Sequence, residues 1–408
     1  MLYKYQESTV LKMLWAMTTP GGSVVALPVG SGKSHIIAEF AARLGKPVLI
    51  FCHSKELLEQ DFEKLQAVVD PNDIGVFSAS LHSKEVKKFT LATIQSAHKH
   101  PELFNHYTVA LIDECSAVNP KNLTGMYNKL FRAIGNPKVI GLDATPFRLD
   151  SFYRATGKHW MPWETVTCTK MITRYKEKFW SNMIAVINTQ QLMDAGYLCK
   201  MVYEDKSFYY HDQLATNKSA SDFDLEAFEE LIGDKEPYVA QHIVESSKKH
   251  KSILVFCSSI SQAERLSRSI QGSYMVSGKT PAKEREMIIN GFKDKSIKVV
   301  FNVGVLTRGF NHPCLDAIYM LRPTKSINLY CQMLGRGTRK AEGKEHCTVY
   351  DFAGNLKGIG TLESVKIEKD ITGKWNVMTT KFPEGAHLKP LYVYSPRPKS
   401  QKEEYVNH

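Results

Sequence analysis

The sequence predicts an α/β protein with two domains, each built around a parallel sheet. Short apolar runs rich in β-branched residues alternate with stretches of helical periodicity, and residues 24–27 and 34–42 are the first such pair. Several of these runs end in polar residues, as expected for parallel sheets, whose ligands collect at the carboxyl ends of the strands. A chain of 408 residues also exceeds the size of one ordinary hydrophobic core.

Shifts in composition along the chain suggest the domain boundaries. The stretch 210–236 is polar and acidic and has no strand signal, so we expect the passage between the domains near it. Residues 370–374 separate two short apolar runs, which predicts a β-hairpin, and a basic tail is expected from Pro390 onward. The predicted parts are a first domain, a second domain, and a hairpin with the tail: residues 1–198, 199–365 and 366–408.

Composition restricts the class of protein and its partners. Hydrophobic residues make up 43% of the chain, and no apolar run approaches the roughly 18 residues of a membrane span, so no membrane partner is expected. The N-terminus lacks the apolar core of a signal peptide, which favours a cytoplasmic location. Eight scattered cysteines without a C-x-x-C pair indicate buried thiols rather than disulfides or zinc sites. The formal net charge of +11 modestly favours nucleic acid as a partner.

A glycine-rich loop between the first apolar run and a helix predicts a phosphate site. Backbone N–H groups of such a loop converge on an anion at the helix N-terminus. Lys33 would reach the β- and γ-phosphates of ATP, and the Ser34 hydroxyl would ligate Mg²⁺. Leu27 occupies the position where the longer form of this loop has its first glycine, and a turn without a ligand is the alternative. The candidate residues are Gly30, Ser31, Gly32, Lys33 and Ser34.

A pair of acids supplies the partner that such a loop needs. The apolar run 108–112 ends in Asp113 and Glu114. Asp113 would hold Mg²⁺ through water, and Glu114 would orient and deprotonate the attacking water. Two acids at a strand end are usually solvated, but after a phosphate-binding loop they favour catalysis.

Other polar residues of the first half are candidates for contacts to adenine or to a sugar–phosphate backbone. Gln6 has the amide that reads an adenine edge in a bidentate way, and a solvated helix glutamine is the alternative. Hydroxyl, amide and ammonium groups near strand ends suit contacts to phosphates, although each is also a plausible helix cap or surface group. These residues are Ser54, Lys55, Thr93, Gln95 and Ser96.

Two arginines in the second half complete the set. Arg336 and Arg339 are three residues apart, which predicts that they share one helical face, and Gln332 precedes them at similar spacing. Guanidinium groups stabilise charge that develops on a transferred phosphoryl group. Because the second half has no phosphate loop of its own, a single nucleotide between the two domains is the simplest interpretation.

Together these motifs resemble those of superfamily 2 helicases of the DEAD/DEAH-like branch, including phage branch-migration, DNA-repair and type III restriction helicases. The resemblance implies two tandem RecA-like domains with an ATP cleft between them. It assigns nucleotide contacts to Gly309 and Asn311, and nucleic-acid contacts to Ser258 and Gly278. His312 is expected to be structural. Departures from the family pattern are Cys115 and Asn302, as well as Asp143, which replaces the usual Ser or Thr.

The function implied by the resemblance is that of an ATP hydrolase acting as a DNA helicase or translocase, with DNA repair or recombination as its setting. ATP and Mg²⁺ are the expected cofactors, and DNA is favoured over RNA as the partner of a monomeric motor. Aromatic and cationic residues between 150 and 210 could stack bases, or they could simply pack the flank of a domain. The alternatives are an RNA-remodelling helicase of DEAD-box type and an ATP-gated nucleic-acid clamp.

Overall fold

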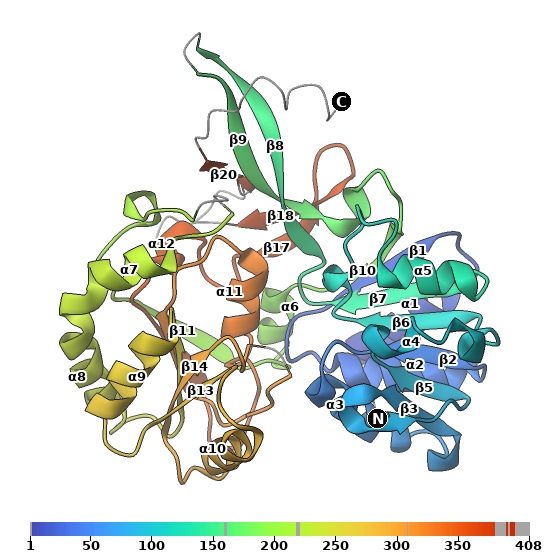
Figure 1. Cartoon of the computed structure of the whole chain (residues 1–408), viewed down its shortest axis with the longest axis horizontal. Helices are drawn as coiled ribbons and strands as arrows, with labels where there is room; N and C mark the ends of the chain where they lie inside the picture. The colour runs from blue at the N-terminus through green and yellow to red at the C-terminus, as the bar shows by residue number, and fades with distance from the viewer. Residues whose placement is uncertain are drawn as a thin grey trace. The chain divides into compact units, whose positions relative to one another are not determined.

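The computed structural model describes residues 2–158, 161–217, 221–307, 309–379, 389–390 and 392–395. Side chains at 151–168 and beyond 379 are not among those described. The chain divides into two compact units (Figure 1). The first consists of residues 1–146, 171–198 and 308–311, and the second of residues 147–170, 199–307 and 312–408. This division differs from the predicted boundaries at residues 147–170 and 308–311, and the boundaries themselves remain predictions.

The first unit contains an eight-stranded sheet in the order β10-β1-β7-β6-β2-β5-β3-β4. Neighbouring strands run parallel, except that β4 pairs with β3 in the antiparallel sense. The predicted parallel α/β class is therefore confirmed for this unit. The strands are β1 (Gly22–Ala26), β2 (Val48–Phe51), β3 (Ile74–Ser78), β4 (Ser83–Lys84), β5 (Phe89–Ala92), β6 (Val109–Asp113), β7 (Lys138–Asp143) and β10 (Trp180–Val186).

Helices pack on the sheet of the first unit, and its inner strands β1, β2 and β6 are buried on both faces. In β6, Val109 and Leu111 belong to one hydrophobic cluster, whereas Ala110 and Ile112 belong to another. Successive strand side chains point to opposite faces, so a strand between two clusters needs a continuous apolar run. The helices are α1 (Lys4–Ala16), α2 (Lys33–Leu44), α3 (Lys55–Gln66), α4 (Ile94–Ala97), α5 (Met126–Ala133) and α6 (Thr189–Asp194).

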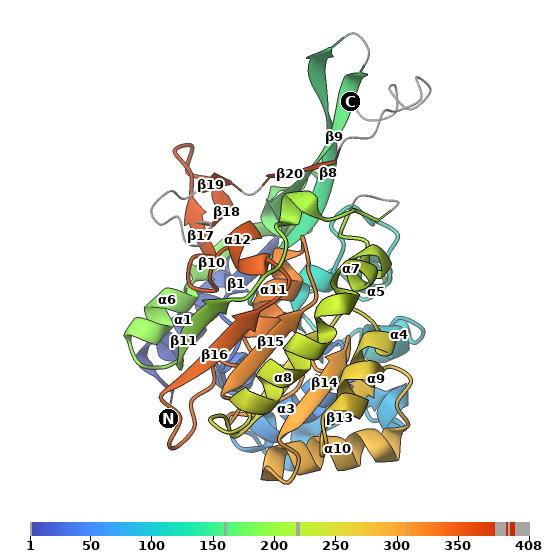
Figure 2. The same ribbon diagram turned by 90° about the vertical axis from the view of Figure 1, so that its left-hand side faces the viewer.

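The second unit repeats the architecture with a six-stranded parallel sheet in the order β11-β16-β15-β12-β14-β13. Figure 2 shows α8 and α9 lying across one face of this sheet. The strands are β11 (Lys200–Asp205), β12 (Ile253–Cys257), β13 (Tyr274–Ser277), β14 (Val299–Val303), β15 (Ala317–Leu321) and β16 (His346–Asp351). The helices are α7 (Leu225–Ile232), α8 (Glu236–Ser246), α9 (Ile260–Ser269), α10 (Ala282–Asp294), α11 (Ile327–Leu334) and α12 (Asn355–Gly358).

Two small antiparallel sheets complete the second unit. In one, β17 (Lys366–Lys369) pairs with β18 (Trp375–Thr379), which also pairs with β19 (Lys389–Pro390). The hairpin predicted around residues 370–374 is therefore confirmed. The other sheet joins β8 (Phe147–Lys158), β9 (Met161–Met171) and β20 (Tyr392–Ser395). The rest of the predicted tail and the aromatic side chains of the hairpin β8–β9 lie outside the described part.

Among the described residues, no helix combines the length and apolarity that crossing a membrane requires.

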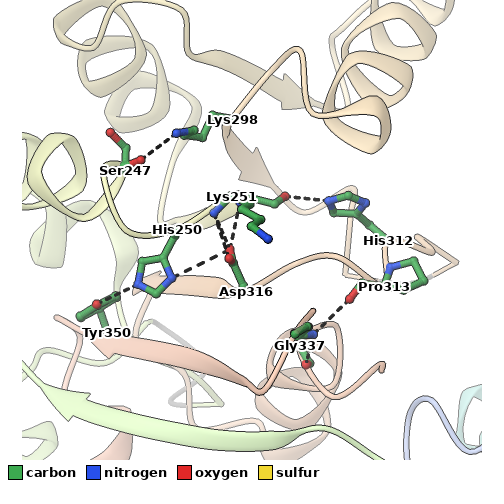
Figure 3. A network of polar contacts seen from close by, with 11 residues as sticks. Ser247, His250, Lys251, Lys298, His312, Pro313, Asp316, Gly337 and Tyr350 are labelled. Carbon is green, nitrogen blue, oxygen red and sulfur yellow. Dashed lines mark hydrogen bonds and ion pairs between the residues drawn. The ribbon is translucent and has the colours of Figure 1, made fainter. Parts of the chain in front are cut away.

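A polar network lies under one edge of the second sheet (Figure 3). The Asp316 carboxylate accepts hydrogen bonds from the backbone N–H groups of Lys251 and Ser252 at 2.9 Å. The Ser252 hydroxyl bonds Nε2 of His312 at 2.7 Å. His312 is only 2% exposed, and burial lowers its pKa to about 4, with positive charges such as that of Lys344 acting in the same direction. His312 is thus a neutral, buried part of the fold, as predicted.

The His312 environment predicts a loss of stability on acidification. The ordinary pKa near 6.5 applies to the unfolded chain, whereas the folded pKa is about 4. Between these pH values the unfolded chain binds a proton on His312 that the folded chain does not. The contribution of His312 to the free energy of unfolding is therefore fully present above pH 6.5 and falls as the pH drops toward 4. We expect the melting temperature of His312→Gln to fall less between pH 7 and pH 5 than that of the wild type. Equal falls would contradict this assignment.

Gly141 on β7 predicts a second effect on stability. A Cβ at this position would lie 2.5 Å from Cβ of Cys115 and 2.6 Å from the Trp180 ring, and both of these neighbours are fully buried. Gly141→Ala should therefore overpack the core and cost about 1–3 kcal/mol, measured as a lower melting temperature. Gly233→Ala is the matched control, because a Cβ there meets nothing within 4 Å. An unchanged melting temperature in Gly141→Ala would refute the packing argument.

Candidate functional site: a glycine loop and its partner acids

The predicted order of strand, glycine loop and helix is present in the first unit. β1 ends at Ala26, and α2 begins at Lys33. Gly30 and Gly32 have φ angles of +84° and +77°, a backbone conformation that residues other than glycine rarely adopt. The Ser31 N–H donates to Pro28 O at 3.2 Å, which closes the turn. The glycines are therefore required by the shape of the loop.

Leu27 belongs to the sheet and not to the loop. Its side chain is fully buried, and its N–H donates to the backbone oxygen of Asp143 at 2.9 Å, one step beyond the pairing of β1 with β7. The compact loop therefore starts after this residue. This explains why the first glycine of the longer form is dispensable here.

Gln6 lies against the loop, and both ends of its side-chain amide make hydrogen bonds to the backbone. Its Nε2 donates to Ser31 O at 3.0 Å, and its Oε1 accepts from the Tyr3 N–H at 2.9 Å. A glutamine amide has two N–H donors and two acceptor lone pairs. The Tyr5 side chain is a further hydrogen-bond partner of this amide. Bidentate contact with an adenine edge requires one donor and one acceptor, so the predicted role of Gln6 remains a prediction.

An aromatic cluster borders the same loop. Tyr5 Oη donates to Ser31 O at 2.6 Å, and its ring centroid lies 5.0 Å from that of Tyr197. Burial is the main cause that raises the pKa of Tyr5 to about 12, so its hydroxyl remains a donor at neutral pH. Ser31 O therefore accepts bonds from two side chains of α1, which anchors the loop to this helix.

Glu114 has a strained backbone at the end of β6. Its φ of +54° lies in the left-handed region, which costs a non-glycine residue about 1–3 kcal/mol when the surrounding structure imposes it. Its Oε1 lies 3.7 Å from Nζ of Lys33, and both side chains are only 10% exposed. The strain thus directs a nearly buried carboxylate toward the loop lysine.

Asp113, directly before Glu114, has a side-chain oxygen without a hydrogen-bond partner among the described residues. This oxygen, Oδ1, is buried. Burial is the main cause that raises the pKa of Asp113 well above its usual range, and the carboxylates of Asp61 and Glu114 add to the effect while Lys33 opposes it. Such a cluster of buried acids is stabilised when a cation joins it.

These donors fit Mg²⁺. The Asp113 carboxylate and the Ser34 hydroxyl are hard oxygen ligands, the type that Mg²⁺ prefers. No group of three histidines, cysteines or acids among the described residues could hold a metal alone. Mg²⁺ is commonly held by one or two protein oxygens together with phosphates and waters, so a site with few protein ligands suits it.

Asp143 ties two motifs of the first unit together. Its Oδ2 accepts a bond from the Ser116 N–H at 2.6 Å, and its Oδ1 accepts from the Thr145 N–H at 2.7 Å. A serine or threonine has one side-chain oxygen, whereas here two separate carboxylate oxygens each accept one of the two N–H groups. This departure from the family pattern therefore links the segments after β6 and β7. Cys115 is a packing residue, because its side chain lies directly over Gly141.

The predicted backbone-contacting residues of the first unit lie at helix N-termini. Ser54 caps α3 by accepting the Leu57 N–H at 3.2 Å, and Lys55 is half exposed. Thr93 directly precedes α4, and its hydroxyl donates to Ser96 Oγ at 3.0 Å. Gln95 is exposed. Ser54 is therefore a capping side chain, whereas Thr93 makes no side-chain cap bond, and the predicted nucleic-acid contacts remain untested.

The second unit positions the predicted arginines differently from expectation. α11 ends at Leu334, so Arg336 and Arg339 lie beyond the helix, and the prediction of one shared helical face is wrong. Arg336 Nε donates to Gln332 O at 3.3 Å. Burial lowers the pKa of Arg339 to about 10, which still leaves this guanidinium charged at neutral pH.

Lys344 fixes the backbone beside these arginines. Its Nζ donates to Gly337 O at 2.7 Å, Arg339 O at 2.8 Å and Pro313 O at 3.2 Å. An ammonium has three donors, so this side chain is fully satisfied. It joins the segment after α11 to the segment before β15, where Pro313 lies (Figure 3). Sequence reasoning missed this residue, because a lysine in a polar turn is usually solvated.

The remaining predicted residues have mixed surroundings, and Gly309 and Asn311 lie in the stretch 308–311, which belongs to the first unit. Ser258 is buried, and its hydroxyl donates to Leu321 O at 2.7 Å, while Gly278 is exposed. Gly309 has a φ of +68°, and Asn311 is exposed. Asn302 Oδ1 accepts the Leu306 N–H at 2.8 Å, so this departure from the family pattern shapes the loop after β14.

Comparisons with known proteins agree with this arrangement. Residues 1–148 match the family described as type III restriction enzyme, res subunit, and residues 234–341 match the helicase conserved C-terminal domain. The Saccharomyces cerevisiae protein IRC3, named as an ATP-dependent helicase, is 26% identical over 358 residues, which cover 81% of this chain and 48% of that protein. The Schizosaccharomyces pombe irc3, named as a mitochondrial ATP-dependent helicase, is 27% identical over 379 residues, covering 88% and 58%.

A solved structure shares the fold. The ATP-dependent Type ISP restriction-modification enzyme LlaBIII, bound to DNA, superposes with a TM-score of 0.61 at 15% identity, covering 86% of this chain and 28% of that one. The chain spans about half the length of the curated relatives that it matches. The first parallel sheet thus lies in a region similar to the restriction-enzyme family and the second in a region similar to the helicase C-terminal domain, so both halves of the chain resemble superfamily 2 helicases.

Proposed function

We propose that this protein is an ATP-dependent helicase or translocase that acts on DNA. The observation that carries the proposal is Glu114, a strained and nearly buried carboxylate 3.7 Å from the loop lysine Lys33. Backbone strain of this kind clusters at active sites and ligand-binding positions. In a phosphate-binding loop, a carboxylate beside the lysine is suited to accept a proton from a water that attacks the terminal phosphate.

The residues of the first unit have distinct roles in this proposal. Backbone N–H groups of the loop and the Lys33 ammonium bind the phosphates, while Gln6 reads the base. Asp113 and Ser34 hold Mg²⁺, which supplies neutralising charge to the phosphate oxygens when it is bound. Glu114 accepts the proton of the attacking water. Its position at a strand end, held by the sheet, keeps the acceptor oriented before the substrate arrives.

The second domain contributes cations to the same reaction. Arg336 and Arg339 are charged at neutral pH and would stabilise charge that develops on the terminal phosphate. An arginine in this role is worth about 10³–10⁵ in rate where it has been measured in GTPases. Gln332, next to Arg336 through its backbone oxygen, would complete this group. Gly309 and Asn311 would contact the nucleotide as the resemblance implies.

DNA is the favoured substrate because the first domain resembles restriction and repair motors, and a net charge of +11 suits a phosphate backbone. Ser54, Lys55, Thr93, Gln95, Ser96, Ser258 and Gly278 would contact one strand, and repeated ATP binding and release would step the motor along it. Branch migration, repair and recombination are settings that this chemistry would serve. We propose a monomer located in the cytoplasm, where thiols stay reduced, because the cysteines described by the structure are free.

Glu114→Gln tests the catalytic assignment. The amide keeps the shape of the side chain but accepts a proton far more weakly, so kcat for ATP hydrolysis should fall about 10²–10⁴-fold. Phosphate release measures the rate, and binding of a fluorescent ADP should change only a few-fold. Glu63→Gln is the matched control, because its carboxylate on α3 is exposed and pairs with Lys64. Unchanged phosphate release in Glu114→Gln would refute the assignment.

A panel of nucleic acids tests the substrate. ATP hydrolysis should be stimulated by single-stranded or duplex DNA more than by RNA, and forked, blunt and four-way DNA should be compared for unwinding. Lys33→Ala should abolish both activities and still bind DNA with a strong dependence on salt. Stimulation by RNA alone would favour the RNA helicase. Tight ATP-dependent binding with negligible turnover in the wild type would favour the clamp.

A further inference from the structure

One side chain of α3 contacts a predicted metal ligand. Gln60 Nε2 donates a hydrogen bond to Ser34 Oγ at 3.1 Å. Ser34 is the second residue of α2 and only 4% exposed, so this bond joins two helices under the glycine loop. Gln60 lies on the helix that begins at the predicted nucleic-acid contacts Ser54 and Lys55, and the proposed phosphate site does not account for its contact with Ser34.

The bond restricts the orientation of the Ser34 hydroxyl. A hydroxyl oxygen has two lone pairs and one proton. Gln60 occupies one lone pair, which leaves the other for a metal ion. The buried Asp61 carboxylate is a second hydrogen-bond partner of the Ser34 hydroxyl. Gln60 as donor and the Asp61 carboxylate as acceptor together restrict the direction of the lone pair on Ser34 Oγ that remains for a metal ion.

The same helix begins at predicted nucleic-acid contacts. Ser54 caps its N-terminus and Lys55 is half exposed there. Six residues separate Ser54 from Gln60, which corresponds to about 9 Å along a helix. Leu58 and Leu65 fix α3 in the core, and Asp61 is 1% exposed. A small displacement of the helix N-terminus would therefore also move Gln60, because an α-helix transmits displacement along its axis.

We propose that Gln60 is a positioning residue that couples nucleic-acid binding at the N-terminus of α3 to the metal ligand Ser34. This inference rests on the proposed function. Nucleic acid that binds Ser54 and Lys55 sets the position of α3, and the Gln60 amide transfers that position to the Ser34 hydroxyl. The affinity for Mg²⁺-bound nucleotide then depends on whether nucleic acid is bound. By linkage, nucleotide changes the affinity for nucleic acid by the same factor.

Gln60→Met in the full chain tests the inference. Methionine has similar length and no N–H donor, so it removes the bond to Ser34 and adds no charge. The dissociation constant of fluorescent ADP with Mg²⁺ is measured with and without saturating single-stranded DNA. Coupling factors of this type are typically about 5–150-fold. We expect a factor in this range for the wild type and a factor near 1 for Gln60→Met.

Controls separate positioning from simple destabilisation. Gln66→Met on the same helix alters an exposed glutamine and should keep the wild-type factor. ADP affinity measured in EDTA should be the same in Gln60→Met and in the wild type, because the bond acts through the metal ligand. Should Gln60→Met fail to fold, Gln60→Ala removes the same donor with a smaller side chain and serves as the second variant.

The outcomes distinguish the inference from the proposed function. A coupling factor in Gln60→Met equal to that of the wild type overturns the inference, and so does a loss of ADP affinity that persists in EDTA. A wild type with DNA-stimulated ATP hydrolysis but no coupling overturns the inference alone. A wild type that neither binds nucleic acid nor hydrolyses ATP overturns the proposed function.

Discussion

The candidate site of the first unit keeps several charged side chains almost buried near the ends of β1 and β6. Lys33 and Glu114 are 3.7 Å apart and almost buried, and Asp113 adds a carboxylate with an unsatisfied oxygen. Isolated charges in such surroundings cost several kcal/mol each, so these residues are tolerated only as a group. The surrounding features serve this group: positive φ at two glycines, a strained Glu114 backbone, and an apolar sheet buried on both faces.

Much of this arrangement could be predicted because it depends on local chemistry. The strands that lead to the site, β1, β6 and β7, are continuous apolar runs between two clusters, and their ends are marked by small or acidic residues. The edge strands β10 and β11 were not predicted, because partial exposure breaks their apolar pattern. β15 has the same apolar run as its neighbours, and its absence from the predicted strands has no physical reason.

Residues that act through tertiary contacts left no signal in the sequence. Asp61 looks like a surface acid in a helix but is buried beside Cys52, at a Sγ–Oδ2 distance of 3.3 Å. The spacing of Arg336 and Arg339 imitates a helix, although α11 ends at Leu334 and Gly337 packs so closely on Cys347 that a Cβ there would lie 2.6 Å from its Sγ. The left-handed backbone of Glu114 is equally invisible, since it is imposed by the turn after β6 and not by residue type.

The Lys344 contacts have a consequence for the length of one surface turn. Loops at the surface usually accept insertions, because their ends can adjust at small entropic cost. Here the turn from Arg339 to Lys344 is closed by the ammonium, which donates to the backbone oxygens of Gly337 and Arg339. An added residue would carry the amine away from both oxygens and leave a half-buried charge with fewer acceptors. The length of this turn is therefore constrained, because the Lys344 ammonium needs these backbone oxygens as hydrogen-bond acceptors. Since the acceptors are backbone atoms, the residue types between Arg339 and Lys344 remain free to vary.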